Sequence, residues 1–152
     1  MAPLRLEDHI RDIPDFPKPG IVFKDITPLF LQPEALRVTV DRLAGWARER
    51  EVDYVMSAEA RGFVLGGALA TAAGCGFVLA RKPGKLPLET ASVQYELEYG
   101  VDALEVHADA VRGGARVLVH DDLLATGGTA GALCGLVEQA GGVVAGCSFV
   151  IE

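Results

Sequence analysis

The sequence predicts an α/β fold, a mostly parallel twisted sheet flanked by helices, and three observations lead to it. Short apolar segments of strand length alternate with segments of helical periodicity. Residues 116–120 are almost continuously apolar, as buried parallel strands are. A turn rich in glycine and threonine follows and leads into another helical segment. Ligands of such sheets bind beyond the carboxyl ends of the strands, so we look for a site there.

The elements are expected in the following order. Residues 13–33 contain five prolines and are expected to be extended and rich in turns. A helix opens at Pro33, after which Leu36, Val40 and Leu43 recur at helical spacing. Two more helices are expected over residues 63–73 and 129–140. Strands are expected over residues 53–56, 77–80, 92–99, 104–107, 116–120 and 143–151.

Composition places this chain among single-domain globular proteins. It has 152 residues, half of them hydrophobic, and a net charge of −7. That charge argues against a nucleic-acid surface. No apolar stretch approaches the ~20 residues that span a bilayer, and the charged N-terminus is unlike a signal peptide. The chain is therefore expected to be cytoplasmic, and in that context the three scattered cysteines are expected to be buried free thiols.

Residues 81–100 form a long connection between predicted strands. Arg81, Lys82 and Lys85 cluster at its start, which is enough positive charge for one small anion or simply for a solvated turn. Its second half alternates like a strand, and Gly100 with the residues that follow suggests a hairpin. Because long loops in small domains are usually functional or mobile, we expect a mobile loop here.

Residues 117–129 are the most informative segment. An apolar strand leads to the adjacent carboxylates Asp121 and Asp122, then to a turn of small and hydroxyl residues, then to a helix. Glycine N–H groups, threonine hydroxyls and a helix N-terminus together suit a phosphate monoester. A plain turn with Thr129 as helix cap would not explain the acidic pair. The P-loop pattern is absent, and the segment around Cys75 lacks the third glycine of a dinucleotide fingerprint.

This segment resembles the phosphoribosyl pyrophosphate motif of type I phosphoribosyltransferases. The form Asp-Asp-Leu-Leu-Ala-Thr-Gly-Gly-Thr is the one seen in adenine phosphoribosyltransferases. The resemblance implies that Asp121 and Asp122 meet the ribose hydroxyls, directly or through Mg²⁺. It implies a 5′-phosphate site made by Ala125, Thr126, Gly127, Gly128 and Thr129. His120 departs from the motif, and we interpret it as a packed histidine.

Two further segments resemble the same family. Residues 59–63 are similar to its pyrophosphate loop, where Arg61 would bind pyrophosphate oxygens. Residues 81–87 and 95–100 resemble the two ends of its catalytic loop, which implies substrate contacts for Arg81 and Lys85. The resemblance also implies that Glu98 handles the purine proton, with Tyr99 beside it. Ala125 agrees with this, since alanine cannot transfer a proton at the position where hypoxanthine-guanine relatives have aspartate.

Residues 16–26 resemble the family's hood, the segment that covers the base. In this resemblance Val22, Phe23 and Lys24 contact adenine, and the hood spans residues 13–33. A proline-rich arm that only caps the core is compatible with the same residues. The chain stops where the family usually continues for roughly another helix and strand, so the family tail is absent or the chain is shortened.

The reaction implied by the resemblance is the joining of adenine to phosphoribosyl pyrophosphate, which yields AMP and pyrophosphate. Mg²⁺ is the implied cofactor and a homodimer the implied assembly. Two alternatives stay open, a transferase for another purine such as xanthine and a non-catalytic regulator that binds phosphoribosyl pyrophosphate. Alanine-threonine-glycine at 125–127 counts against the first, and Glu98 with Arg61 against the second.

Overall fold

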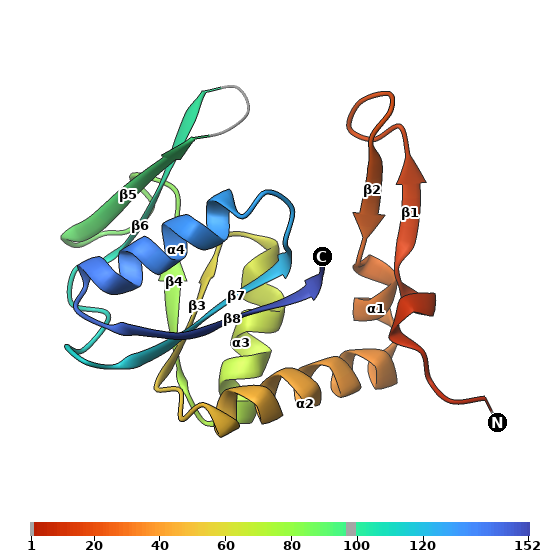
Figure 1. Ribbon diagram of the computed structural model, residues 1–152, viewed down its shortest axis with the longest axis horizontal. Helices are drawn as coiled ribbons and strands as arrows, with labels where there is room; N and C mark the ends of the chain where they lie inside the picture. The colour runs from red at the N-terminus through yellow and green to blue at the C-terminus, as the bar shows by residue number, and fades with distance from the viewer. Residues whose placement is uncertain (1, 97–99) are drawn as a thin grey trace.

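A computed structural model describes residues 2–96 and 100–152 of the chain and has a four-stranded parallel sheet at its centre (Figure 1). The strand order is β4–β3–β7–β8. The strand bounds are β3, Tyr54–Ala58; β4, Gly76–Ala80; β7, Arg116–Leu123; and β8, Val143–Ile151. The predicted α/β class with a parallel sheet is therefore confirmed.

Helices cover both faces of this sheet. On one side lie α2 (Pro33–Glu49) and α3 (Arg61–Ala73), and on the other lies α4 (Gly128–Gln139). Successive side chains of a strand point to opposite faces. Leu118 accordingly packs in the cluster that contains residues of α2 and α3, whereas Val117 and Val119 pack with residues of α4. The central strand is thus buried on both faces, as its continuous apolar run predicts.

Strand β7 is longer than expected. The sequence pattern indicates an end at His120, but β7 continues to Leu123. The reason is β8, which pairs Asp121 with Phe149 and Leu123 with Ile151. The acidic pair therefore lies on the last part of a hydrogen-bonded strand rather than in the loop after it, so the sheet itself fixes its direction.

Two antiparallel hairpins stand outside the central sheet (Figure 1). The first consists of β1 (Arg11–Pro14) and β2 (Val22–Asp25), between the 3₁₀ helix η1 (Leu6–His9) and the short helix α1 (Thr27–Leu31). The second consists of β5 (Thr90–Glu96) and β6 (Val101–His107). Strand β6 begins earlier than the predicted residue 104 because residues 101–103 pair with residues 94–96.

The first hairpin is joined to the main body at its base. Ile26 and Leu29 of this region are buried together with Leu65 of α3, and Val150 and Ile151 at the end of β8 pack against them. Its tip is more open, since Phe16 is 50% exposed and Val22 is 55% exposed. Among the helices of the described residues, none combines the length and apolar character needed to cross a membrane.

Candidate active site

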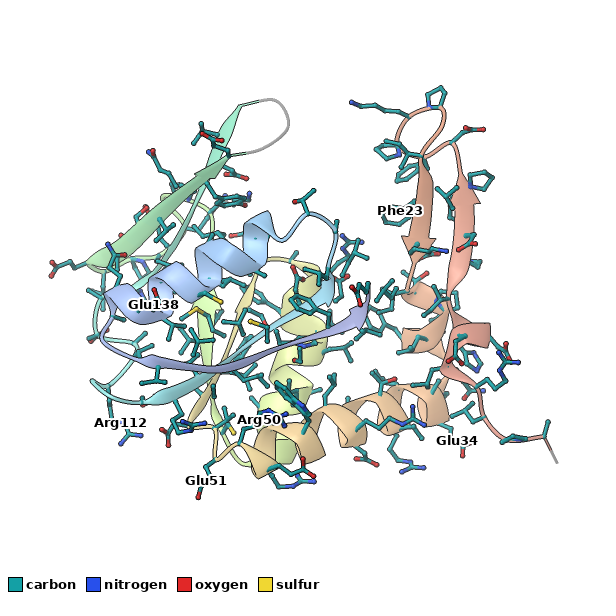
Figure 2. The ribbon with its side chains drawn as sticks, viewed as in Figure 1. Phe23, Glu34, Arg50, Glu51, Arg112 and Glu138 are labelled. Atoms are coloured by element: carbon teal, nitrogen blue, oxygen red, sulfur yellow. The ribbon has the colours of Figure 1, made fainter. Side chains whose placement is uncertain are left out.

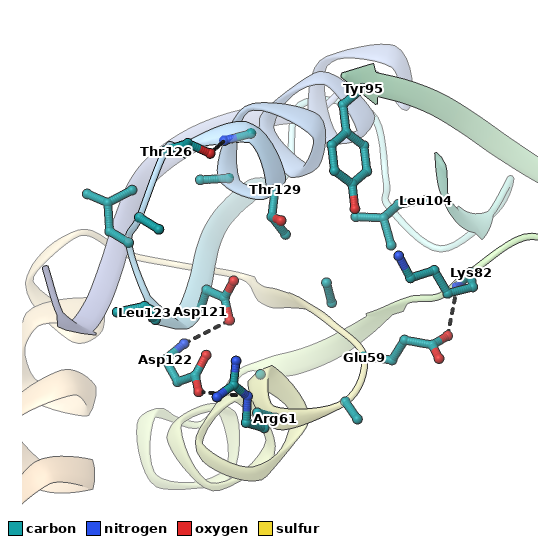
Figure 3. A pocket seen from close by; sticks show the side chains of 18 residues that line it. Glu59, Arg61, Lys82, Tyr95, Leu104, Asp121, Asp122, Leu123, Thr126 and Thr129 are labelled. Carbon is teal, nitrogen blue, oxygen red and sulfur yellow. Dashed lines mark hydrogen bonds and ion pairs between the residues drawn. The ribbon is translucent and has the colours of Figure 1, made fainter. Parts of the chain in front are cut away.

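A cavity of about 400 Å³ opens at the carboxyl ends of β3 and β7 (Figure 3). Its walls come from two segments, residues 58–62 from the end of β3 to the start of α3 and residues 121–130 from the end of β7 to the start of α4. Lys82, Tyr95 and Leu104 complete the lining. This is the edge of the sheet at which the topology predicts a ligand.

The acidic pair lies at the inner wall of this cavity. The Asp122 side chain is only 6% exposed, and its Oδ2 lies 3.4 Å from Nε of Arg61. The backbone N–H of Asp122 donates to Oδ1 of Asp121 at 2.8 Å. Burial, and then the neighbouring Asp122, raise the pKa of Asp121 to about 7. A group that donates hydrogen bonds or brings positive charge, such as sugar hydroxyls or a divalent cation, would stabilise both carboxylates as anions.

The connection from β7 to α4 forms a tight turn at the cavity. Gly127 occupies the N-cap position of α4 with a φ of 84°, a backbone conformation that residues other than glycine rarely adopt. The hydroxyl of Thr126 accepts a hydrogen bond from the N–H of Gly128 at 3.4 Å. Because residues 127–130 line the cavity, the positive end of the helix dipole faces it. An anion fits here for electrostatic reasons.

The connection from β3 to α3 packs tightly against the acidic pair. A Cβ atom on Gly62 would lie 3.3 Å from Cβ of Ser57 and 3.4 Å from Oδ1 of Asp121. Glycine at this position therefore allows the close approach of the two loops. It places the guanidinium of Arg61, at the start of α3, next to Asp122 at the cavity wall.

The predicted hood residues lie on β2, outside the cavity lining. Phe23 faces the main body (Figure 2), and the guanidinium carbon of Arg61 lies 5.6 Å from its ring centre. Phe16 packs edge-on against the same ring at 5.2 Å. Nζ of Lys24 lies 2.6 Å from Oδ1 of Asp12 across the hairpin. The structure therefore brings Phe23 next to Arg61 of the predicted pyrophosphate loop. Val22 is exposed, and Lys24 is paired within the hairpin.

The predicted cations of the long connection are not gathered in one place. Lys85 is exposed on a turn and does not line the cavity. Arg81 also lies outside the lining, where its Nε donates to Oε1 of Glu59 at 3.3 Å. Glu98 and Tyr99 lie outside the described residues.

The sequence analysis gave no individual role to Lys82, Tyr95 or Glu59, although all three lie in segments that it singled out. Lys82 and Tyr95 line the cavity, and Glu59 accepts the backbone N–H of Lys82 at 2.7 Å. One signal could have identified Lys82. Neighbouring residues of an extended segment point in opposite directions, so a predicted role for Arg81 leaves Lys82 facing the other way.

His120 is fully buried beneath the site. Its Nδ1 lies 2.9 Å from the hydroxyl of Ser148 on the adjacent strand. Burial lowers the pKa of His120 to about 4, so the ring is neutral near pH 7. This geometry agrees with the packed histidine expected from the sequence.

A parallel sheet whose carboxyl edge carries an acidic pair, a glycine-threonine phosphate turn and an arginine loop is the architecture of the type I phosphoribosyltransferase class. The chain is 62% identical to the adenine phosphoribosyltransferase of Rubrobacter xylanophilus, over 97% of this chain and 80% of that protein. It is 56% identical to that of Clostridium perfringens, over 98% and 87%. The chain belongs to the adenine phosphoribosyltransferase family.

Solved structures agree with this assignment. The adenine phosphoribosyltransferase of Thermoanaerobacter pseudethanolicus superposes with a TM-score of 0.91 at 53% identity, covering 95% of this chain and 86% of that one. The Saccharomyces cerevisiae enzyme, complexed with adenine and an imino-altritol bisphosphate, gives 0.93 at 39% identity, covering 97% and 86%. No protein-family model matches the chain.

Proposed function

We propose that this protein converts adenine and phosphoribosyl pyrophosphate to AMP and pyrophosphate. The observation that carries the proposal is the cavity itself, where Asp121, Asp122 and Arg61 meet the N-terminus of α4. In the reaction the bond from C1 of the ribose to pyrophosphate breaks and a bond from N9 of adenine to C1 forms. The N9 proton leaves the base.

The 5′-phosphate binds in the turn made by Ala125 to Thr129. Backbone N–H groups at the start of α4 donate to the phosphate oxygens, and the threonine hydroxyls add further donors. Support comes from the position of this turn, which lines the cavity directly after the acidic pair. The site thereby binds the sugar through its 5′-phosphate, which takes no part in the reaction.

The acidic pair stabilises the sugar as C1 becomes cationic in the transition state. Asp121 and Asp122 accept hydrogen bonds from the ribose hydroxyls. The residues also fit Mg²⁺, since their donors are all oxygen and Mg²⁺ is commonly bound by one or two carboxylates together with substrate phosphates. When bound, Mg²⁺ neutralises charge on the leaving pyrophosphate.

Cationic side chains receive the leaving group. Arg61, already at the cavity wall, binds pyrophosphate oxygens. Lys85 and Arg81 belong to residues 81–100, the proposed mobile loop, and Lys85 would reach the pyrophosphate after the loop closes. Closure would also exclude the water that could hydrolyse the activated sugar.

The hood selects and holds the base. Phe23 stacks on adenine, while backbone groups of residues 22–24 pair with its amino group and ring nitrogen. The 5.6 Å contact of Arg61 with the Phe23 ring supports this placement, because it puts the base beside the leaving group. Glu98 takes the N9 proton, and Tyr99 packs beside it.

A single assay tests the function. The protein is incubated with phosphoribosyl pyrophosphate, Mg²⁺ and each of adenine, hypoxanthine, guanine and xanthine. We expect AMP from adenine and turnover at least ~100-fold poorer with the other bases, because buried polar groups matched to one base are left unpaired by another. Comparable turnover of guanine or xanthine would contradict the adenine assignment, and binding without turnover would favour a regulator.

We also propose that the protein is a cytoplasmic homodimer. Exposed apolar side chains such as Val64 on α3 and Leu79 on the edge strand β4 support an interface between copies. The three cysteines are free thiols, which suits a reducing compartment. Light scattering coupled to gel filtration tests the dimer, and a monomeric mass at micromolar concentration would contradict it.

A further inference from the structure

A second charged group faces the cavity, on the side away from the acidic pair (Figure 3). Nζ of Lys82 donates to Oδ2 of Asp102, and the hydroxyl of Tyr95 donates to the same oxygen at 3.4 Å. Lys82 and Tyr95 line the cavity, whereas Asp102 lies behind them on β6. A cation that lines the cavity is therefore already paired with a carboxylate of the protein.

The backbone of Lys82 is held firmly. Its N–H donates to Oε1 of Glu59 at 2.7 Å. The neighbouring Arg81 exchanges two backbone hydrogen bonds with Glu105 of β6, each 2.8 Å long. The start of the Lys82 side chain is thus fixed between the β3–α3 connection and the second hairpin, and only the flexible ammonium end is free to change partner.

Lys82 and Asp102 are both charged, but their ion pair is open to competition from other ions. The hydrogen bond between Lys82 and Asp102 raises the pKa of the ammonium and lowers the pKa of the carboxyl group, so both are ionised near pH 7. Their side chains are 40% and 27% exposed. Ion pairs in such surroundings contribute little stability, so an incoming polyanion can compete for the ammonium.

We propose that Asp102 is a positioning residue that competes with pyrophosphate for the ammonium of Lys82. Before phosphoribosyl pyrophosphate binds, Asp102 neutralises Lys82 and holds it at the cavity wall. When the pyrophosphate group arrives, the ammonium exchanges the carboxylate for phosphate oxygens, and it returns to Asp102 as the product leaves. Asp102 therefore limits product inhibition. The inference rests on the proposed function, since it assigns Lys82 to that leaving group.

The test removes the charge of Asp102 and retains its shape. Asp102→Asn keeps the Oδ1 acceptor that receives the N–H of Ala103 at 2.8 Å, so the local strand should be preserved. We expect the inhibition constant of Mg-pyrophosphate against phosphoribosyl pyrophosphate to fall roughly three- to tenfold, the range between an exposed ion pair and a charge-assisted hydrogen bond. The KM for adenine should not change.

A double variant shows whether Asp102 acts through Lys82. In a Lys82→Met background, Asp102→Asn should have no further effect on pyrophosphate inhibition. Asp109→Asn is the matched control, since it removes the same charge from an exposed residue outside the cavity lining. Unchanged or weaker pyrophosphate binding in Asp102→Asn, or the same change with Lys82 removed or with Asp109→Asn, would overturn the inference.

A measurement on the unmodified protein keeps the test independent of how the variants fold. In carbon-13 spectra, the Asp102 carboxyl signal should shift when Mg-pyrophosphate saturates the protein, because its ammonium partner departs. An unchanged signal at saturation would contradict the exchange. AMP formation from adenine is measured on the same sample, so loss of the proposed function and loss of this inference give different results.

Discussion

The sugar-phosphate half and the base half of the site are built from different kinds of structure. Asp121 and Asp122 lie at the end of β7, a strand that is packed on both faces. Its pairing with β3 ends at Val119, and its pairing with β8 continues to Leu123. The proposed base contacts lie on β2 and on residues 95–100, which belong to separate two-stranded hairpins. Isolated two-stranded hairpins are marginally stable at best, so the base half depends on its anchors and its ligands.

This difference suggests an order of events. The proposed phosphate turn and the acidic pair both line one cavity, so we expect phosphoribosyl pyrophosphate to meet a preformed site. The hood reaches that site chiefly through Phe23 and Arg61. We therefore expect the sugar substrate to bind first and adenine to bind between the hood and the sugar. Substitutions in the two halves should then separate cleanly in their kinetics.

The largest effect is expected in the preformed half, for Asp122→Ala. The variant removes a buried carboxylate that we propose contacts the sugar both before and during the reaction, and it leaves Arg61 without this partner. We expect kcat/KM for phosphoribosyl pyrophosphate to fall roughly 10²- to 10³-fold, the scale for losing one preorganised electrostatic group. Steady-state kinetics measures this, with circular dichroism as a check on folding. A change under about threefold would remove Asp122 from the site.

The next largest effect is expected for Glu98→Gln. The amide keeps the size of the side chain but cannot accept the purine proton. We expect kcat to fall about 10²-fold with little change in the KM for phosphoribosyl pyrophosphate, as for the loss of a proton-transfer group. Single-turnover measurements would separate this step from product release. Near-normal kcat would show that another group handles the proton.

A smaller effect is expected for Phe23→Ala in the hood. The substitution removes the stacking face for adenine but leaves the cavity lining intact. We expect the KM for adenine to rise about tenfold, which corresponds to the ~1.4 kcal/mol of one aromatic contact. Binding of phosphoribosyl pyrophosphate, measured by calorimetry, should be unchanged. If Phe23→Ala weakened the binding of adenine and of phosphoribosyl pyrophosphate equally, the two halves of the site would not be independent.

The proposed sugar-phosphate half is predicted well from the sequence, because its residues are close together along the chain. The apolar run of β7, the acidic pair and the glycine at 127 form one continuous segment, so their relation in space follows from their relation in sequence. The exception is the end of β7, which depends on pairing with Phe149 and Ile151, residues far along the chain. A single sequence carries no local signal for such a partner.

The base half and the cations proposed for the leaving group were harder to predict, because their positions depend on contacts between distant segments. The proline-rich residues 13–33 indicate turns, but a hairpin from β1 to β2 also needs Arg11 opposite Asp25. Lys82 is held at the cavity by its contacts with Glu59 and Asp102, and neither residue is near it in the sequence. The resemblance to a family supplied roles for Glu98 and Lys85 that no periodicity would indicate.

The smallest effect is expected for Arg11→Ala, which tests the anchoring of the hood. Nη2 of Arg11 donates to Oδ2 of Asp25 at 2.7 Å and joins β1 to β2.

A hydrogen bond from the backbone of Thr27, and then Arg11, lower the pKa of Asp25 to about 2. A depressed pKa means that the ionised carboxylate stabilises the hood above pH 3.8, its ordinary pKa, and that this stabilisation is lost as the pH falls toward 2. The Arg11 side chain is 61% exposed, whereas the Asp25 side chain is 16% exposed. Because solvent screens the guanidinium, the melting temperature should change little. Arg11→Ala should instead raise the pKa of Asp25, as followed by carbon-13 titration, and speed amide exchange in β1 and β2 near pH 7. Arg37→Ala is the control for removing an exposed arginine, since Arg37 is 64% exposed and pairs with Asp41 on α2. Its partner Asp41 is 59% exposed, more than the 16% of Asp25. The KM for adenine should rise only about twofold, the range of a surface ion pair. A rise as large as that of Phe23→Ala would mean that this one ion pair, rather than the buried base around Leu29, sets the position of the hood.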